Sequence, residues 1–166
     1  GIYYFFQHEV GKHTLTLADS YAAHEAVEGY EAYVFLPQAI DTPRQRDEVI
    51  EDWLASKEMQ PGAYVVDDYD FERPSVELEA QFKDPRQHAR SRLEMYDYPG
   101  EFVAKPDGER IARTRLEELL AQHEFCEASG TTRSLQVGSL FTLTAHPRAD
   151  QNREYLVTSA EYSMRF

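Results

Sequence analysis

The feature that most constrains the fold of this 166-residue chain is one helical stripe set among short β-like runs. A helix is predicted over 109–123, where apolar residues recur at the spacing of one helix face. This stripe consists of Ala112, Leu116, Leu119 and Leu120. Asp107 precedes it as the predicted N-cap. The stripe carries no chemistry and indicates a helix packed on a β structure.

The other periodic stretches are short, strand-like and separated by turns. Residues 2–6 and 14–17 flank a Gly-containing loop, which predicts a β-hairpin. In the alternating run 76–82, the side chains of Val76, Leu78, Ala80 and Phe82 are expected to face inward. A polar stretch at 41–47 indicates a loop or subdomain boundary. The remaining strands are expected at 33–36, 49–56, 63–71, 92–97, 124–128, 141–145 and 154–158.

These runs amount to about seven to nine strands and one helix. We therefore predict a mainly β (α+β) fold, an antiparallel barrel or sandwich with one packed α-helix.

Composition excludes several classes of function. The net charge of −13 disfavours contact with nucleic acid and with anionic lipid. No run of about 18 apolar residues predicts a transmembrane helix, and the first residues lack the features of a signal peptide. The chain begins with Gly rather than Met, so we expect a processed product or a piece of something longer. The single cysteine, Cys126, permits no internal disulfide, which favours folding in a reducing compartment.

Two groups of side chains have a composition that could serve metal binding or catalysis. The acidic run 67–72 has the composition of a calcium site or of a glycosidase carboxylate pair, but EF-hand spacing is absent and Asp68 and Asp70 fit a solvated strand edge. A hairpin could bring His8 and His13 together, yet no carboxylate joins them at ligand spacing, so zinc is not expected. His146 is expected to make structural hydrogen bonds at a strand end.

The remaining candidates are also better explained structurally. Cys126 has no basic partner in the sequence and is expected to be a buried or half-buried thiol. No serine elbow, dinucleotide fingerprint or phosphate loop occurs. The side chains of Tyr3, Tyr64 and Tyr69 are of a type that stacks on sugars, but packing in the core of strands explains them better. We therefore predict no catalytic, cofactor-binding or metal-binding residues and no enzymatic activity.

Several stretches, in order across nearly the whole chain, resemble the VgrG family, the tip proteins of bacterial type VI secretion systems. The matching residues are Gly1–Phe5, Gly11–Leu15, Leu17–Ser20, Trp53, Pro61–Gly62, Asp68–Pro74, Tyr98–Gly100, Gly108–Glu109, Ala112–Arg113, Arg115–Glu117, Arg133, Leu135, Gly138, Phe141–Leu143, His146–Pro147, Asn152 and Tyr155–Ser159.

The resemblance implies a hub of the phage-tail type, with two related β-barrels joined by a connecting subdomain. Residues 1–45 would be the end of that subdomain, and 46–166 the second barrel with helix 109–123. It also implies a homotrimer that joins a hexameric Hcp-like tube to a downstream spike or needle with its tip-cap protein. Baseplate components and effector cargo are further implied partners. The protein would assemble in the bacterial cytoplasm and then be secreted or enter the target cell. A phage-tail or baseplate hub protein that binds or hydrolyses glycans is the alternative.

Overall fold

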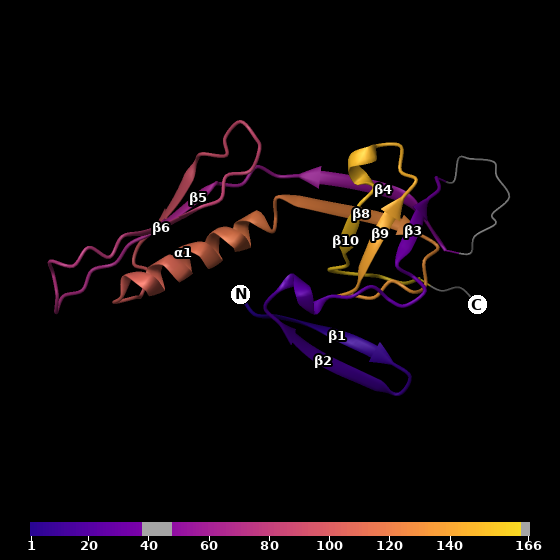
Figure 1. Cartoon of the computed structure of the whole chain (residues 1–166), viewed down its shortest axis with the longest axis horizontal. Coiled ribbons are helices and arrows are strands. Elements are labelled where there is room, and N and C mark those ends of the chain that lie inside the picture. Colours follow the sequence, from indigo (N-terminus) through magenta and orange to yellow (C-terminus); the bar gives the residue numbers. More distant parts are fainter. Residues whose placement is uncertain (38–47, 164–166) are drawn as a thin grey trace. The chain divides into compact units, whose positions relative to one another are not determined.

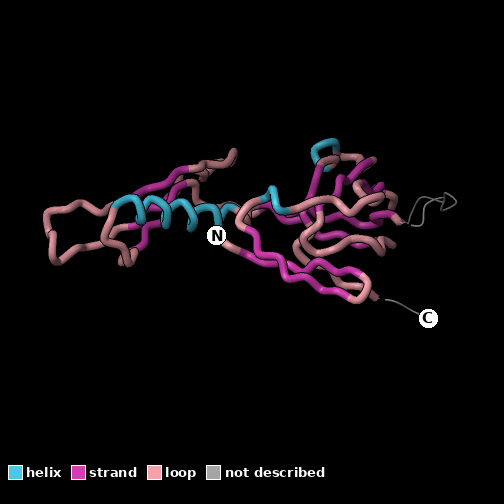
Figure 2. The backbone as a smooth tube through the Cα atoms, turned by 60° about the horizontal axis from the view of Figure 1, so that its bottom comes forward, coloured by secondary structure: helices cyan, strands magenta, loops and turns pink. Residues whose placement is uncertain are grey.

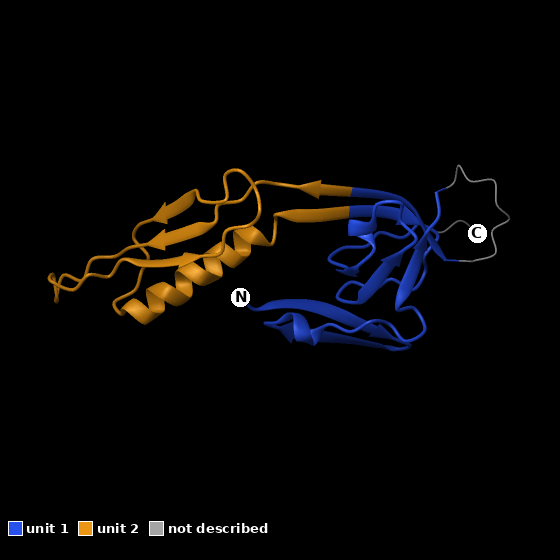
Figure 3. Cartoon of the chain, turned by 45° about the horizontal axis from the view of Figure 1, so that its top comes forward, with its two compact units in different colours: residues 1–54, 127–166 blue, residues 55–126 orange. Residues whose placement is uncertain are grey.

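The computed structural model describes residues 1–37 and 48–163, so the loop predicted at 41–47 lies outside the described residues. These residues form ten strands, one α-helix and two short 3-10 helices, η1 (Tyr21–Ala23) and η2 (Ala149–Gln151) (Figure 1). The chain divides into two compact units (Figure 3). Unit 1 contains residues 1–54 and 127–166, and unit 2 contains residues 55–126.

Unit 1 begins with the predicted hairpin, which the structure confirms. Strand β1 (Tyr3–Glu9) pairs antiparallel with β2 (Lys12–Ala18) across the tight turn at Val10 and Gly11. Both strands run further toward the turn than the sequence predicts, since Glu9 and Lys12 are still paired. Gly11 has a φ of 73°, which glycine adopts with little strain.

A curled five-stranded sheet forms the rest of the framework of unit 1 (Figure 1). Its order is β10-β9-β3-β4-β8. The bounds are β3 (Ala32–Phe35), β4 (Val49–Lys57), β8 (Glu124–Gly130), β9 (Leu140–Thr144) and β10 (Glu154–Leu156). Strand β10 is antiparallel to β9, whereas β3 is parallel to both β4 and β9.

The core of this sheet is aromatic. Its buried residues are Tyr33, Ile50, Phe141, Leu143 and Val157. The only tryptophan, Trp53, packs against this cluster, and its indole Nε1 donates a 3.0 Å hydrogen bond to Oε1 of the buried Gln151. The indole polar group is therefore satisfied inside the core, as buried tryptophan requires.

Unit 2 pairs a small sheet with the helix. Strands β5 (Ala63–Val66), β6 (Ala80–Lys83) and β7 (Glu94–Asp97) lie in the order β6-β5-β7. Strand β5 is antiparallel to β6 and parallel to β7. Helix α1 (Lys105–Leu120) is the only long helix among the described residues, as the tube in Figure 2 shows.

The predicted apolar stripe is the face that helix α1 buries. Ala112, Leu116 and Leu120 are buried and Leu119 is partly buried. They pack against Tyr64, Val66, Leu78, Ala80 and Phe102. The partners thus lie in and beside the three-stranded sheet of unit 2, and not in the larger sheet where a barrel was expected.

The bounds of the helix differ from the prediction. It begins at Lys105 rather than near Glu109, because Pro106 occupies the first turn, where the missing N–H has no intrahelical partner to lose. The N-cap is therefore Ala104, and the predicted cap Asp107 lies in the first turn, where its negative charge is favourable. The helix ends at Leu120, three residues before the predicted end.

Two predicted strands are too long. The strand expected over 63–71 ends at Val66, because side chains of the following aspartates bond to backbone amides and form turns. Of the run 76–82, only the end joins strand β6; Leu78 and Ala80 are buried as predicted, whereas Val76 is exposed.

The mainly β fold with one packed helix is confirmed. The sheets are mixed rather than purely antiparallel, because β3 and β7 run parallel to their neighbours. The compact units also differ from the division predicted at 45/46, since β3 pairs with β4 and β9 and so groups early and late residues together. The assignment of 1–45 to a connecting subdomain and 46–166 to a second barrel stays a prediction.

Candidate functional site

A buried histidine, His24, attaches the hairpin to the rest of unit 1. Its Nδ1 donates to the carbonyl oxygen of Gly138 at 2.8 Å, since a carbonyl can only accept. Its Nε2 lies 2.7 Å from the Tyr3 hydroxyl, which also donates to the Ser20 carbonyl at 3.0 Å. One imidazole thus links strand β1 to the segment that precedes β9.

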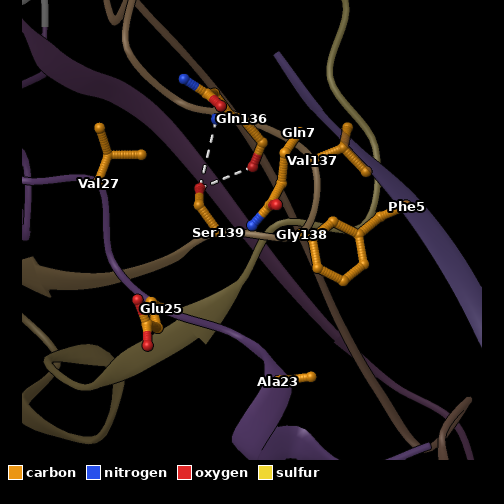
Figure 4. Close-up of a pocket in the computed structure, with 9 residues that line it drawn as sticks. All are labelled: Phe5, Gln7, Ala23, Glu25, Val27, Gln136, Val137, Gly138 and Ser139. Carbon is orange, nitrogen blue, oxygen red and sulfur yellow. Dashed lines mark hydrogen bonds between the residues drawn. The ribbon is translucent and has the colours of Figure 1, made fainter. Parts of the chain in front are cut away.

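Beside His24, the side chain of Phe5 fixes the inner face of the hairpin. Phe5 is buried and its ring centroid lies 4.9 Å from that of His24. Gly138, at a φ of 86°, leaves room for this ring: a Cβ there would lie 2.2 Å from Phe5 Cδ2. A shallow pocket opens next to this contact, lined by residues from β1, from 23–27 and from 136–139 (Figure 4).

The opposite face of the hairpin is apolar and exposed. The cross-strand register places Tyr4 opposite Leu17 and Phe6 opposite Leu15, so that all four side chains share one face. Their exposed fractions are 66%, 68%, 44% and 54%. We refer to Tyr4, Phe6, Leu15 and Leu17 as the hairpin face. Contiguous apolar surface of this kind typically marks a site of protein–protein contact.

The hairpin face ends in a histidine pair. His8 and His13 are direct partners across the hairpin, and their Nδ1 atoms lie 2.7 Å apart. The structure therefore brings together the two histidines whose proximity the hairpin spacing indicated. Phe6 continues the aromatic row, with its ring centroid 6.3 Å from that of His8.

The acidic run 67–72 is a structural turn. Asp70 is buried, and it accepts hydrogen bonds from the backbone amides of Glu72 and Arg73 and from Arg73 Nε at 2.8 Å. The bond from Arg73, followed by those from the amides, holds the pKa of the Asp70 carboxyl below its usual value. Asp68 accepts from the amide of Phe102. These carboxylates bond to their own chain, although not on the strand edge that the sequence predicts.

The other candidate residues are dispersed. Tyr64 is buried in the core of unit 2, whereas Tyr69 is exposed. Cys126 is half-buried in β8, as predicted. His146 takes part in local loop contacts: its amide donates to Asn152 Oδ1 at 2.8 Å, and its Nδ1 accepts from the Arg148 amide. Residues 1–37 and 48–163 contain no group of three or more His, Cys, Asp or Glu placed to hold a metal ion.

Two exposed hydrogen-bonded contacts in unit 1 shift the pKa of a side chain. Hydrogen bonds from Arg148 and then from Gln151 lower the pKa of Asp150 to about 2. Partial burial, followed by a hydrogen bond to Glu154, raises the pKa of Tyr21 to about 12. Both pKa shifts are explained by these local contacts within unit 1.

The hairpin face is the feature that the sequence reading missed. The run 2–6 predicts one strand of a hairpin, but both of its alternating sets of side chains are apolar, so the pattern does not distinguish the buried face from the exposed one. The pattern of β2 nevertheless indicated an apolar face, since Leu15 and Leu17 alternate with threonines.

No helix in the described part of the chain is long and apolar enough to cross a bilayer.

Phe5 and His24 hold one face of the hairpin against the rest of unit 1, and the other face is apolar and exposed, as surfaces that contact other chains typically are. The family sequence model described as "Phage tail baseplate hub (GPD)" matches residues 1–165. This chain therefore belongs to the phage tail baseplate hub family.

Curated relatives agree with that assignment. The chain is 46% identical over 162 residues to the type VI secretion system spike protein VgrG1a of Pseudomonas aeruginosa, a match that covers 98% of the chain and 25% of the relative. VgrG1c of the same organism is 45% identical over 98% of the chain and 22% of its own length. VgrG2a is 28% identical over 92% of the chain and 18% of its length. The chain thus spans a quarter or less of the length of these relatives.

Proposed function

We propose that this chain is a non-catalytic, structural piece of the hub of a type VI secretion tip. The observation that carries the proposal is the family match across residues 1–165. The geometry supports it, because the Asp70 carboxylate bonds within a turn and His146 within a loop, and neither is arranged as a nucleophile with its base.

In this proposal the whole protein is a homotrimer that joins a hexameric Hcp-like tube to the downstream spike and its tip-cap protein. It contacts baseplate components and helps to deliver effector cargo. Assembly takes place in the bacterial cytoplasm, after which the tip is secreted or enters the target cell. Two observations support the proposal: the relatives are spike proteins of type VI secretion systems, and the hairpin face is apolar and exposed.

We further propose that the hairpin face contacts a second copy of the chain in the assembled hub. Phe5 and His24 fix the inner side of the hairpin to unit 1, so the outer side is presented in one orientation. Covering Tyr4, Phe6, Leu15 and Leu17 would remove apolar area from water at about 25 cal/mol per Å². The net charge of −13 opposes association only modestly at physiological salt, where the Debye length is about 8 Å.

Light scattering tests the assembly. The full-length protein should be a stable trimer, whereas residues 1–166 alone should be monomeric or weakly associated at micromolar concentration. Leu17→Lys in the full-length protein should weaken the trimer, because it places an ammonium group in the proposed contact. Leu93→Lys, at an exposed leucine of unit 2, is the matched control. An intact Leu17→Lys trimer would exclude the hairpin face as the contact, and a secretion-competent monomer would exclude the trimer itself.

A substrate screen separates this proposal from a glycan-binding or glycan-hydrolysing hub. The purified chain should neither bind glycans nor hydrolyse peptidoglycan, phospholipid or oligosaccharide. A measured turnover that Asp68→Asn or Asp70→Asn abolished without loss of the fold would overturn the structural reading. We expect Asp70→Asn to lower stability instead, because Asp70 accepts three hydrogen bonds from Glu72 and Arg73.

A further inference from the structure

We propose that His8 and His13 form a two-histidine site for a divalent transition-metal ion of the imidazole-binding class, of which Zn²⁺ and Cu²⁺ are representatives. The register places the site near the turn of the hairpin, on the same side as the hairpin face. The inference rests on the geometry of the hairpin alone and does not depend on the proposed function.

The backbone places the two rings together before any metal binds. His8 and His13 are directly opposed in the antiparallel register, one pair away from the turn at Val10 and Gly11. Directly opposed Cβ atoms in such a pair lie about 4.5–5.5 Å apart, within reach of a shared ligand for two imidazoles. The tight turn fixes the register, so little conformational freedom remains to be lost on binding.

The ring geometry is close to that of two neighbouring metal ligands. The Nδ1 atoms lie 2.7 Å apart, the ring centroids 4.9 Å apart, and the ring planes make an angle of 70°. Zinc–imidazole bonds of about 2.0–2.1 Å in tetrahedral geometry require a separation of roughly 3.3 Å between the two nitrogens. The pair must therefore open by about half an ångström, and the rings must turn until both Nδ1 lone pairs point at one ion. Side-chain torsions supply both movements without a change in the backbone.

The tautomers open to the two imidazole rings also permit metal binding. A 2.7 Å contact between two Nδ1 atoms requires that one ring carries its proton on Nδ1 and donates it to the other. Both Nδ1 lone pairs become available when the donor ring moves this proton to its Nε2. The metal then replaces the shared hydrogen bond, and no proton is gained or lost by the neutral pair.

Two neutral imidazoles select the class of ion. Imidazole suits zinc, copper and nickel, whereas calcium and magnesium prefer oxygen ligands, and affinity rises toward Cu²⁺ in the divalent series. Both histidines are exposed, so the remaining coordination positions are open to water or to a donor on a docked surface. The net charge of −13 raises the concentration of cations near the protein.

The other histidines in the described part of the chain offer no equivalent pair. His24 is held by Gly138 and Tyr3, and the Nδ1 of His146 accepts from Arg148. His88 and His123 stack with their ring centroids 5.6 Å apart, but the nitrogens of His88 are buried and Nδ1 of His123 bonds to the Glu58 carbonyl.

Titration of residues 1–166 with Zn²⁺ against a chromophoric chelator tests the site. We expect one Zn²⁺ per chain, with an affinity that falls at least about tenfold when one ligand is lost, because the second imidazole binds at high effective concentration. The control with the same composition is His13→Thr combined with Thr14→His, which moves the ring to the opposite face of β2. A second variant, His13→Gln, removes the ligand if the exchanged pair perturbs the hairpin.

Ring NMR spectra supply an independent readout. On addition of one equivalent of Zn²⁺, the resonances of two of the six histidines, His8 and His13, should shift while the other four stay in place. Equal affinity of the unaltered chain and both variants would overturn the proposal. So would comparable shifts of all six rings, which would show adventitious binding only.

Discussion

Truncation of Leu116 tests the packing of helix α1 most directly. Leu116 is fully buried (0% exposed) between the helix and the sheet of unit 2, in the cluster that contains Leu78 and Phe102. Leu116→Ala removes three carbons, each worth about 0.8 kcal/mol of transfer free energy. The cavity left in a close-packed core adds to this loss, so we expect the free energy of unfolding to fall by about 2–5 kcal/mol.

Two spectroscopic probes report on the two units separately in a denaturant titration. Far-UV circular dichroism at the helix band follows α1 in unit 2, and tryptophan fluorescence follows Trp53 in the core of unit 1. The Leu116→Ala loss should appear in the helix signal. Leu93→Ala, at a leucine of unit 2 that is 57% exposed, is the matched control and should change stability by less than about 0.5 kcal/mol. A loss below about 0.5 kcal/mol for Leu116→Ala itself would refute the packing argument.

Two further predictions concern unit 1. Gly138→Ala should destabilise unit 1 more than Gly29→Ala does. Both glycines have a positive φ, but only at Gly138 would the new Cβ collide with Phe5. Equal losses of stability in thermal melts would show that backbone strain alone matters. Asp150, whose pKa is about 2 against an ordinary 3.8, contributes stability that is present above about pH 4 and is lost as the pH falls toward 2. Carboxyl NMR titration should show this pKa rising in Arg148→Gln, and an unchanged value would mean that Arg148 is not its cause.

The sequence predicted correctly those helices and strands whose residue pattern fits only one kind of secondary structure. The stripe from Ala112 to Leu120 has the helical period and is buried as expected. The hairpin follows from two β-rich runs around a Gly-containing turn, and its spacing indicated that His8 and His13 are neighbours.

The predictions of strand and helix bounds were wrong where two physical effects compete for the same residues. Asp68 and Asp70 continue the alternation of a strand, but the carboxylates of Asp67 and Asp70 bond to nearby amides and β5 ends at Val66. Pro106 lies within the first turn of α1, where a sequence reading expects a boundary. The parallel pairing of β3 with β9 joins residues more than a hundred positions apart, and no local pattern encodes it.

Unit 2 is a continuous segment that interrupts unit 1, and this arrangement fixes an order during synthesis. Residues 55–126, with β5, β6, β7 and α1, are all synthesised before β9. The edge of β3 that pairs with β9 therefore stays unpaired at least until residue 144 has been translated. Since unpaired strand edges are the usual starting points of aggregation, the nascent chain is most vulnerable in this interval. A ribosome that stalls between residues 55 and 140 of this chain would prolong this interval.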